Sequence, residues 1–286
     1  MSVSSKHRER VKSNPTSVAN WIARATQSLK TAHIASAQLD AELILAHVLH
    51  RSRTWLHAHS DDVIDESRLS VAEACLTLRL DHVPVAYIIG HKEFYGRRFH
   101  VSPATLVPRP ESETIISVLG RLVEPTHHTF IDVGTGSGCL GITAKIEYPT
   151  LSVMLSDISA PALEIAALNA KELRAEVTCV RSDLLESISG SFDFIVANLP
   201  YVDQSWEIST DIAHEPALAL FADDSGLALI KQLLAQAVTR LTPSGYLLLE
   251  ADPCQHDEII AVAKKKQLPI GSHRRVYYRI ISCVVS

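Results

Sequence analysis

The feature that most limits the fold of this chain is a series of short apolar runs, which alternates with helical patterns from about residue 128 onward. The apolar runs read TFIDV, LSVML, VTCV, FDFIVA, GYLLLE and, near the C-terminus, VYYRIISCVV. Between them lie amphipathic stretches such as SAPALEIAALNAKEL, in which Ser159 is placed to cap a helix. Continuous apolar strands separated by such helices predict an α/β fold with a parallel sheet covered on both faces.

The first eighty-odd residues have a pattern that is typical of a helical bundle. In QLDAELILAHVLH, Leu39, Leu43 and Leu49 recur at the helical period, so we expect this face to be buried. Asp40 and Glu42 lie off that face. A second helical pattern, SRLSVAEACLTLRLDH, follows, and no strand alternation is present in this region.

Glycines and prolines interrupt the pattern between these two regions. EFYG and RFHV predict two short strands around a turn. Pro110 then begins a helix that has Glu111 and Glu113 in its first turn. We therefore expect three parts, namely a helical domain over residues 1–88, a hairpin linker over 89–110 and an α/β domain over 111–286.

Composition excludes several classes of protein. Of the 286 residues 47% are hydrophobic, enough for a sizeable core, and a net charge of -5 with a pI near 6.3 argues against nucleic-acid binding driven by charge. No apolar run approaches the length of a membrane span, and the polar N-terminal stretch predicts no secretory signal. The five cysteines form no CxxC pair, so we expect a cytoplasmic protein without disulfides or a metal site.

A glycine-rich loop follows the first strand of the α/β region. FIDVGTGSGCLGITA places Gly134, Gly136 and Gly138 between a strand and a helix, where glycine permits a tight turn and close approach of a ligand. Cys139 stands where the dinucleotide fingerprint needs glycine, and no lysine completes a phosphate loop. Asp157 follows the second strand, where an acid can accept both hydroxyls of a ribose. The pair predicts a nucleoside ligand without phosphate, and S-adenosylmethionine fits; the alternative is a glycine turn with a helix-capping Asp.

The fourth strand ends in ANLPY, at the sheet edge where the glycine loop also lies. The side-chain carbonyl of Asn198 and the backbone carbonyl of Leu199 are two acceptors that can face a substrate NH2. Pro200 pushes the residue before it towards an extended conformation, and Tyr201 offers a flat ring for stacking. We expect the target to be the planar NH2 of an amide or a base, oriented towards a sulfonium methyl. A simple turn at the end of a strand is the alternative.

Together these motifs resemble the glutamine N5-methyltransferases that modify peptide chain release factors, a branch of the class I methyltransferases. The likeness runs over nearly the whole chain and includes DAELILAHVL, PVAYIIGHKEFYG, FHVSPATLVPRPESE and EPALALFADDSGL. The resemblance implies a Rossmann-like class I methyltransferase sheet with an N-terminal helical bundle and a β-hairpin linker. It also implies transfer of a methyl group from S-adenosylmethionine to the glutamine of the Gly-Gly-Gln motif in class 1 release factors, with the helical domain docking this partner.

The resemblance further implies a set of site residues. Those for the methyl donor are Gly134, Thr135, Gly136, Ser137, Gly138, Asp157, Leu184 and Asn198. Those for the glutamine amide and for catalysis are Asn198, Leu199, Pro200 and Tyr201. Asp183 is added from its own place after the third strand in VRSDLL, where it can contact the adenine region. The alternative for Asp183 is an ordinary role in a loop, without contact to the donor.

Three further residues match family positions with an alternative for each. Phe94 and Tyr95 lie where the family lines its glutamine pocket, and packing within the hairpin is the alternative. Arg109 lies in a motif near the donor, and an ion pair with Glu111 or Glu113 is the alternative to a direct role.

The chain departs from the family pattern at two places. Leu199 replaces the first proline of the hallmark Asn-Pro-Pro-Tyr, but any residue supplies the backbone carbonyl, so we expect looser preorganisation with the chemistry kept. LLLEADPCQHDEI lacks the usual glycine after the Glu, and LPIGSHRRVYYR matches the family's Asp-Gly-Arg segment poorly.

The alternatives to the main reading are an N-methyltransferase of another protein or of a nucleic-acid amino group, and a non-catalytic donor-binding assembly protein. We favour a monomer that binds neither nucleic acid nor membrane.

Overall fold

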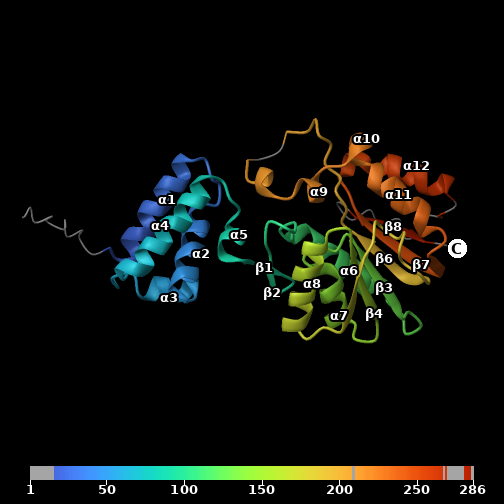
Figure 1. Ribbon diagram of the computed structural model, residues 1–286, viewed down its shortest axis with the longest axis horizontal. Coiled ribbons are helices and arrows are strands. Elements are labelled where there is room, and N and C mark those ends of the chain that lie inside the picture. Colours follow the sequence, from blue (N-terminus) through green and yellow to red (C-terminus); the bar gives the residue numbers. More distant parts are fainter. Residues whose placement is uncertain (1–15, 208–209, 267, 269–279, 285–286) are drawn as a thin grey trace, which may run out of the picture. The chain divides into compact units, whose positions relative to one another are not determined.

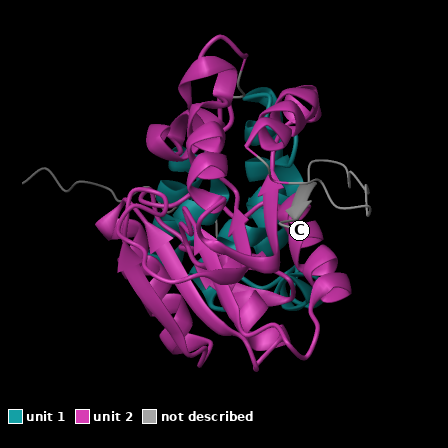
Figure 2. Ribbon diagram, turned by 90° about the vertical axis from the view of Figure 1, so that its right-hand side faces the viewer, with its two compact units in different colours: residues 1–89 teal, residues 90–286 magenta. Residues whose placement is uncertain are grey.

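The computed structural model describes residues 16–207, 210–266, 268 and 280–284. The chain divides into two compact units, Met1–Ile89 and Gly90–Ser286 (Figure 2). The segment of residues 90–110, most of the predicted linker, belongs to the second unit. Among the described residues, no helix is both long and apolar enough to cross a membrane.

The described part of the first unit is helical, as its sequence predicts. Its helices are α1 (Val18–Thr31), α2 (Ala37–Leu49), α3 (Arg53–Ala58), α4 (Glu66–Leu80) and α5 (Val85–Ile89) (Figure 1). Ser17, Ser52 and Asp65 cap three of them, because each side chain accepts a backbone N–H from the third residue further on. Trp21 is fully buried among the aliphatic side chains of α1, α2 and α4.

Helix α2 forms where predicted, but its buried face was predicted only in part, since Leu49 is buried as expected and other positions differ. Leu39 is 42% exposed, whereas Asp40 and Glu42 are each 2% exposed. Arg79 donates to Asp40 at 2.7 Å and Arg53 donates to Glu42 at 2.9 Å. Because a buried carboxylate is tolerated when it is paired, these two arginines allow the acids to face inward.

The second unit begins with an antiparallel hairpin and continues into a mixed sheet with helices on both faces (Figure 1). Its strands are β1 (His91–Phe94), β2 (Arg97–His100), β3 (Thr129–Val133), β4 (Ser152–Asp157), β5 (Val177–Arg181), β6 (Phe192–Ala197), β7 (Leu241–Glu250) and β8 (Ile280–Val284). Its helices are η1 (Pro110–Ser112), α6 (Glu113–Leu122), α7 (Cys139–Glu147), α8 (Ala160–Glu172), η2 (Ile212–His214), α9 (Ala217–Leu220), α10 (Asp223–Gly226), α11 (Ala228–Ala237), η3 (Pro253–Gln255) and α12 (His256–Lys265).

The sheet order within the described residues is β5-β4-β3-β6-β7-β8. Strands β3 to β7 are parallel, as predicted, but β8 runs antiparallel to β7, so the parallel prediction is wrong for this edge strand. The order reverses between β3 and β6, whose register pairs Val133 with Ala197. Open α/β sheets bind ligands beyond the carboxyl ends of the strands at such a reversal.

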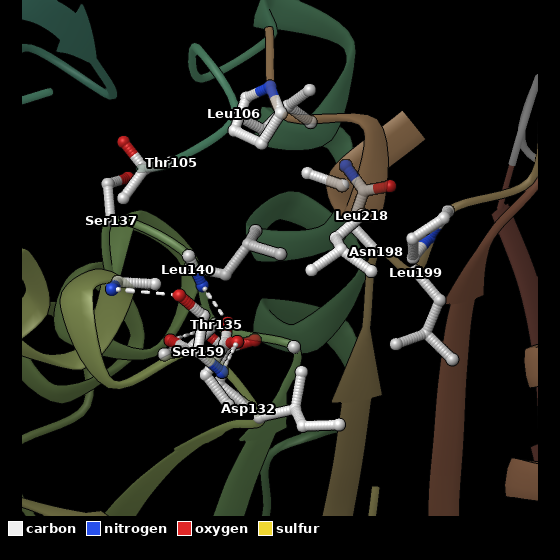
Figure 3. A pocket seen from close by; sticks show the side chains of 18 of the residues that line it. Thr105, Leu106, Asp132, Thr135, Ser137, Leu140, Ser159, Asn198, Leu199 and Leu218 are labelled. Carbon is white, nitrogen blue, oxygen red and sulfur yellow. Dashed lines mark hydrogen bonds between the residues drawn. The ribbon is translucent and has the colours of Figure 1, made fainter. Parts of the chain in front are cut away.

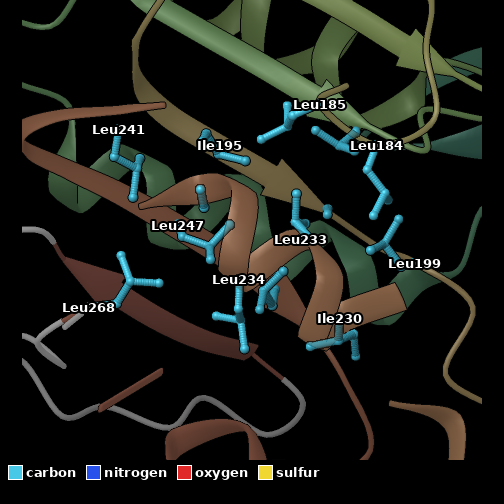
Figure 4. Close-up of a cluster of buried hydrophobic side chains, with 14 of the residues drawn as sticks. Leu184, Leu185, Ile195, Leu199, Ile230, Leu233, Leu234, Leu241, Leu247 and Leu268 are labelled. Atoms are coloured by element: carbon cyan, nitrogen blue, oxygen red, sulfur yellow. The ribbon is translucent and has the colours of Figure 1, made fainter. Parts of the chain in front are cut away.

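Two hydrophobic clusters cover the two faces of this sheet. Alternate residues of β6 divide between them, with Phe194 and Val196 facing α6, α7 and α8, and with Ile195 and Ala197 facing α11 and α12. Figure 4 shows the cluster on the α11 and α12 side of the sheet, in which Leu199 continues the apolar face beyond the end of β6. The carboxyl end of β6 is thus held from both sides, which makes it a firm base for a site.

Candidate functional site

The glycine loop has the backbone conformation that its sequence predicts. Gly134 and Gly136 have φ values of +69° and +55°, in the left-handed region that favours glycine. A Cβ atom on Gly134 would lie 2.9 Å from Cδ2 of Leu199, so the loop approaches the end of β6 closely. A Cβ on Gly136 would meet nothing within 4 Å, so the loop is open on that side.

Asp157 connects this loop to the next helix. Its Oδ2 atom accepts the backbone N–H of Gly136 at 2.9 Å, and its Oδ1 atom accepts that of Ser159 at 2.9 Å. Ser159 in turn caps α8 by accepting the N–H of Ala162, as predicted. Each carboxylate oxygen keeps further acceptor capacity, which a pair of ribose hydroxyls can use.

A cavity of about 390 Å³ lies above these residues (Figure 3). Eight of the nine predicted donor residues line it: Gly134, Thr135, Gly136, Ser137, Asp157, Asp183, Leu184 and Asn198. Gly138 does not line it, and a Cβ there would lie 2.7 Å from Ile142, so this glycine permits close packing at the start of α7. Residues 104–106 supply another part of the wall, as do Pro216, Leu218 and Ala219.

Asp132 lines the same cavity and was missed by the sequence analysis. It is 1% exposed, and its Oδ2 atom accepts both the hydroxyl of Thr135 at 2.6 Å and the N–H of Gly141 at 2.9 Å. Burial raises the pKa of Asp132 to about 6, and the nearby charge of Asp157 adds to this shift. An acid inside the otherwise apolar run TFIDV, directly before the glycine loop, is the signal that could have identified it.

A second cavity, of about 400 Å³, adjoins the first. The two share six lining residues, Leu106, Arg109, Asn198, Leu199, Pro200 and Ala219. Tyr201 and Trp206 line only the second cavity. Residues 198–200 therefore form a common wall, so a donor in one cavity and an acceptor in the other would both contact the end of β6.

The Asn198 amide is held from one side. Its Nδ2 atom donates to Oγ of Ser112 at 3.1 Å, and the Ser112 hydroxyl donates to Oε2 of Glu250 at 2.6 Å. Ser112 and Glu250 are 2% and 1% exposed. With its nitrogen so engaged, Asn198 has its carbonyl oxygen left for a ligand. Leu199 lines both cavities, and its side chain is 4% exposed and packs in the core below the end of β6.

The two hairpin residues lie apart from these cavities. Phe94 is 1% exposed and meets Phe99 edge to face at a ring-centroid distance of 6.1 Å. Tyr95 packs partly against the same core, and its N–H donates to Glu113 at 2.8 Å. Neither residue lines either cavity. Phe94 packs within the hairpin, and a contact of Phe94 and Tyr95 with the substrate stays a prediction.

Arg109 lines both cavities and makes an ion pair that the sequence did not indicate. Its guanidinium donates to Oε1 of Glu215 at 2.5 Å, rather than to Glu111 or Glu113. Glu215 is 7% exposed and its other oxygen accepts the N–H of Val107 at 3.0 Å. This carboxylate joins the two segments that complete the cavity walls.

Comparison with known proteins decides the family. The model for the PrmC N-terminal domain matches residues 20–90, and that for the methyltransferase small domain matches residues 112–219. The release factor glutamine methyltransferase of Koribacter versatilis is 38% identical over 240 residues, which cover 80% of this chain and 86% of that protein. The protein of the same name from Escherichia coli is 34% identical over 236 residues, covering 81% and 84%.

This chain belongs to the release factor glutamine methyltransferase family. It is therefore a methyltransferase, and S-adenosylmethionine is its methyl donor. A methyltransferase from Pyrococcus furiosus has the same fold, with a TM-score of 0.51 at 18% identity over 77% of this chain and 98% of that one.

The chemistry of the first cavity suits S-adenosylmethionine, so we expect this to be the donor cavity. Asp132, Asp157 and Asp183 line it, and their carboxylates suit a ligand that bears a sulfonium and an ammonium group. Asp157 offers acceptors for ribose hydroxyls, and Leu184 beside Asp183 offers an apolar surface for a purine. Among the described residues, no cluster of His, Cys, Asp or Glu side chains is arranged to hold a metal ion.

Proposed function

We propose that this methyltransferase transfers the methyl group of S-adenosylmethionine to the side-chain amide nitrogen, N5, of the glutamine in the Gly-Gly-Gln motif of class 1 peptide chain release factors. The observation that carries the proposal is Asn198, which lies on the wall common to both cavities with its amide nitrogen bound to Ser112. The names of the curated relatives agree with it.

The chain's own residues supply orientation. S-adenosylmethionine provides an electrophilic methyl carbon on a positively charged sulfur. Asn198 Oδ1 and the Leu199 carbonyl are placed to accept the two hydrogens of the substrate amide, which raises electron density on its nitrogen and points it at the donor cavity. As the nitrogen–carbon bond forms, the carbon–sulfur bond breaks, and one amide proton passes to solvent. Positioning and electrostatics of this kind suffice without an activated nucleophile on the enzyme.

The division of labour along the chain is part of the proposal. Residues 1–88 dock the release factor, and residues 111–286 hold the donor and perform the transfer. Residues 89–110 link these two parts. Support comes from the two family models, which match residues 20–90 and 112–219 separately. Tyr201 and Trp206, in the second cavity only, give the glutamine side of the site its aromatic surface.

Mass spectrometry of a release factor incubated with the enzyme and S-adenosylmethionine tests the proposal. We expect a gain of one methyl group on the Gly-Gly-Gln glutamine and none when that glutamine is replaced by Asn. Asn198→Ala should abolish the transfer while leaving the dissociation constant of the donor nearly unchanged. A wild-type enzyme that binds the donor and methylates no release factor would refute the proposal and favour another amino or amide substrate.

A further inference from the structure

We infer that Ser112 and Glu250 are positioning residues that determine which end of the Asn198 amide faces the substrate. The inference rests on the proposed function, because an acceptor oxygen is needed there only when the substrate offers an NH2 group. Both side chains are buried, and they reach Asn198 in series, at 3.1 Å and then 2.6 Å.

An asparagine side chain does not define its own orientation. The amide has nearly the same shape after a half-turn about its last bond, but the turn exchanges an acceptor oxygen for an NH2 donor. If the NH2 of Asn198 faced a substrate NH2, two donors would oppose each other and the grip on the substrate would be lost. A site that depends on Asn198 Oδ1 therefore needs a group that distinguishes the two ends.

Ser112 alone cannot make that distinction, because a hydroxyl both donates and accepts. Glu250 removes the ambiguity. The Ser112 hydroxyl donates its proton to Glu250 Oε2 at 2.6 Å, and a carboxylate in its ionised form can only accept there. The Ser112 oxygen is then left as an acceptor, and the nitrogen of Asn198 is the end that can donate to it, at 3.1 Å. The direction of donation runs from Asn198 through Ser112 to Glu250 and leaves Oδ1 on the cavity side.

The fold places these groups together from three separate elements. Glu250 is the last residue of β7, and the register pairs Leu249 with Ala197, so Asn198 and Glu250 follow paired positions on adjacent strands. Ser112 ends the short helix η1, which precedes α6. Because Ser112 and Glu250 are 2% and 1% exposed, bulk water has little access to replace either partner.

The roles of Ser112 and Glu250 can be tested by measuring kcat for methylation of the release factor in four variants. Glu250→Gln keeps the size of the side chain, but its NH2 can donate to Ser112 and release the hydroxyl proton towards Asn198 Oδ1. We expect Ser112→Ala and Glu250→Gln each to lower kcat by at least about tenfold, the equivalent of one lost hydrogen bond of moderate strength. Ser112→Thr keeps the hydroxyl and should keep kcat within about threefold of wild type. The double variant should be no slower than Ser112→Ala, because both changes act through one hydroxyl.

The affinity for S-adenosylmethionine, measured by calorimetry, is the control for folding. Ser112 lies at the wall of the donor cavity, but its hydroxyl is engaged by Asn198 and Glu250, so the affinity should stay within about twofold in all four variants. A Glu250→Gln variant that binds the donor and keeps wild-type kcat would overturn the inference. If Glu250→Gln does not fold, the comparison of Ser112→Ala with Ser112→Thr decides: equal kcat values for these two would overturn it.

A second measurement separates this inference from the proposed function. In nitrogen-15-labelled protein with bound donor, the side-chain NH2 signals of Asn198, identified by their absence in Asn198→Asp, should exchange slowly with water. They should shift in Ser112→Ala and in Glu250→Gln and stay close to wild type in Ser112→Thr. Signals that are unchanged in Ser112→Ala would refute the inference, whether or not the wild-type enzyme methylates a release factor.

Discussion

Asp157 accepts the backbone amide of Gly136 at 2.9 Å, so one carboxylate both orders the glycine loop and faces the donor cavity. The two residues are 21 positions apart, at the ends of adjacent parallel strands. Loss of the carboxylate would therefore act on the donor directly and on the shape of the loop.

Asp157→Ala should weaken donor binding by about 1.5–3 kcal/mol, the range for a lost hydrogen bond to a charged group. Asp157→Asn keeps one oxygen that can accept from Gly136, so its loss should be smaller. Calorimetric titration with S-adenosylmethionine measures both. An unchanged affinity in Asp157→Ala would remove this residue from the site.

Asp132 should make stability depend on pH in a direction unusual for a carboxylate. Its pKa of about 6 in the folded state lies above the ordinary value of 3.8, so the folded state binds the proton more tightly than the unfolded state. The free energy of unfolding should therefore fall as pH rises from about 4 to about 6, by about 3 kcal/mol from this group. Asp132→Asn lacks the titrating group. Urea denaturation across this range should show the wild-type stability falling relative to the variant, and a constant difference would contradict the raised pKa.

Gly226 packs closely against the backbone of Tyr201, the residue that follows the wall residues 198–200. Its φ is +80°, and a Cβ there would lie 2.0 Å from the carbonyl oxygen of Tyr201 and 2.6 Å from the Gln255 amide nitrogen. Gly226→Ala should therefore displace Tyr201 and lower both stability and methyl transfer. Gly190→Ala is the matched control, because Gly190 has a φ of +87° with nothing within 4 Å. That control should cost only backbone strain, about 1–2 kcal/mol, and equal losses of activity in the two variants would contradict a contact with Tyr201.

The ion pair between Arg109 and Glu215 should respond asymmetrically to mutation. Arg109→Ala leaves the Glu215 carboxylate, whose side chain is 2% exposed, with one fewer partner in a buried place and should cost about 1–3 kcal/mol of stability. Glu215→Gln keeps an acceptor for the Val107 amide, and the Arg109 guanidinium, 32% exposed, can turn to water. We therefore expect a smaller loss in Glu215→Gln by denaturant titration, and the reverse order would show that Arg109 is the more buried charge in solution.

Leu199→Pro should leave the rate of methyl transfer equal to wild type or higher, because proline keeps the carbonyl and stiffens the backbone. The Leu199 side chain is 4% exposed, and its Cδ2 atom lies close to Gly134. Replacing it removes buried apolar atoms, so we expect a stability loss of about 1 kcal/mol. Methyl incorporation measures the transfer rate, and thermal denaturation measures the loss of stability. A large drop in rate would show that the Leu199 backbone amide, or its packing, is needed.

Local patterns in the sequence were enough to predict the sheet and to name eight residues that line one cavity. Apolar runs located β3 to β7, glycines located the loop before α7, and Ser159 located the start of α8. Asp157 and Asn198 could be placed because each directly follows or ends a strand, and strand ends of a parallel sheet meet at one edge. Strand β8 was found as an apolar run, but its direction depends on a connection that periodicity does not describe.

Pairings between distant residues could not be predicted in this way. Asp40 is buried because Arg79 meets it 39 positions later, and Ser112 meets Glu250 138 positions later. Hydrophobic periodicity scores each position by its own side chain, so a buried charge is assigned to the surface until its partner is known. Phe94 shows another limit, since the sequence does not tell packing within the hairpin, which the structure shows, from a contact with substrate.

The insertion of β6 between β3 and β7 has a consequence for how the enzyme is made. During synthesis the glycine loop and Asp157 are made before β6, and a chain that ends before β6 has the donor's loop without its opposite wall. The cavity closes only after β6 has entered beside β3, where Asp193 accepts the amides of His128 and Thr129 at 2.7 and 2.9 Å. Glu250, at the end of the last parallel strand, arrives later still. An unfinished chain therefore has little capacity to sequester the cell's methyl donor, and competence begins with the completed sheet.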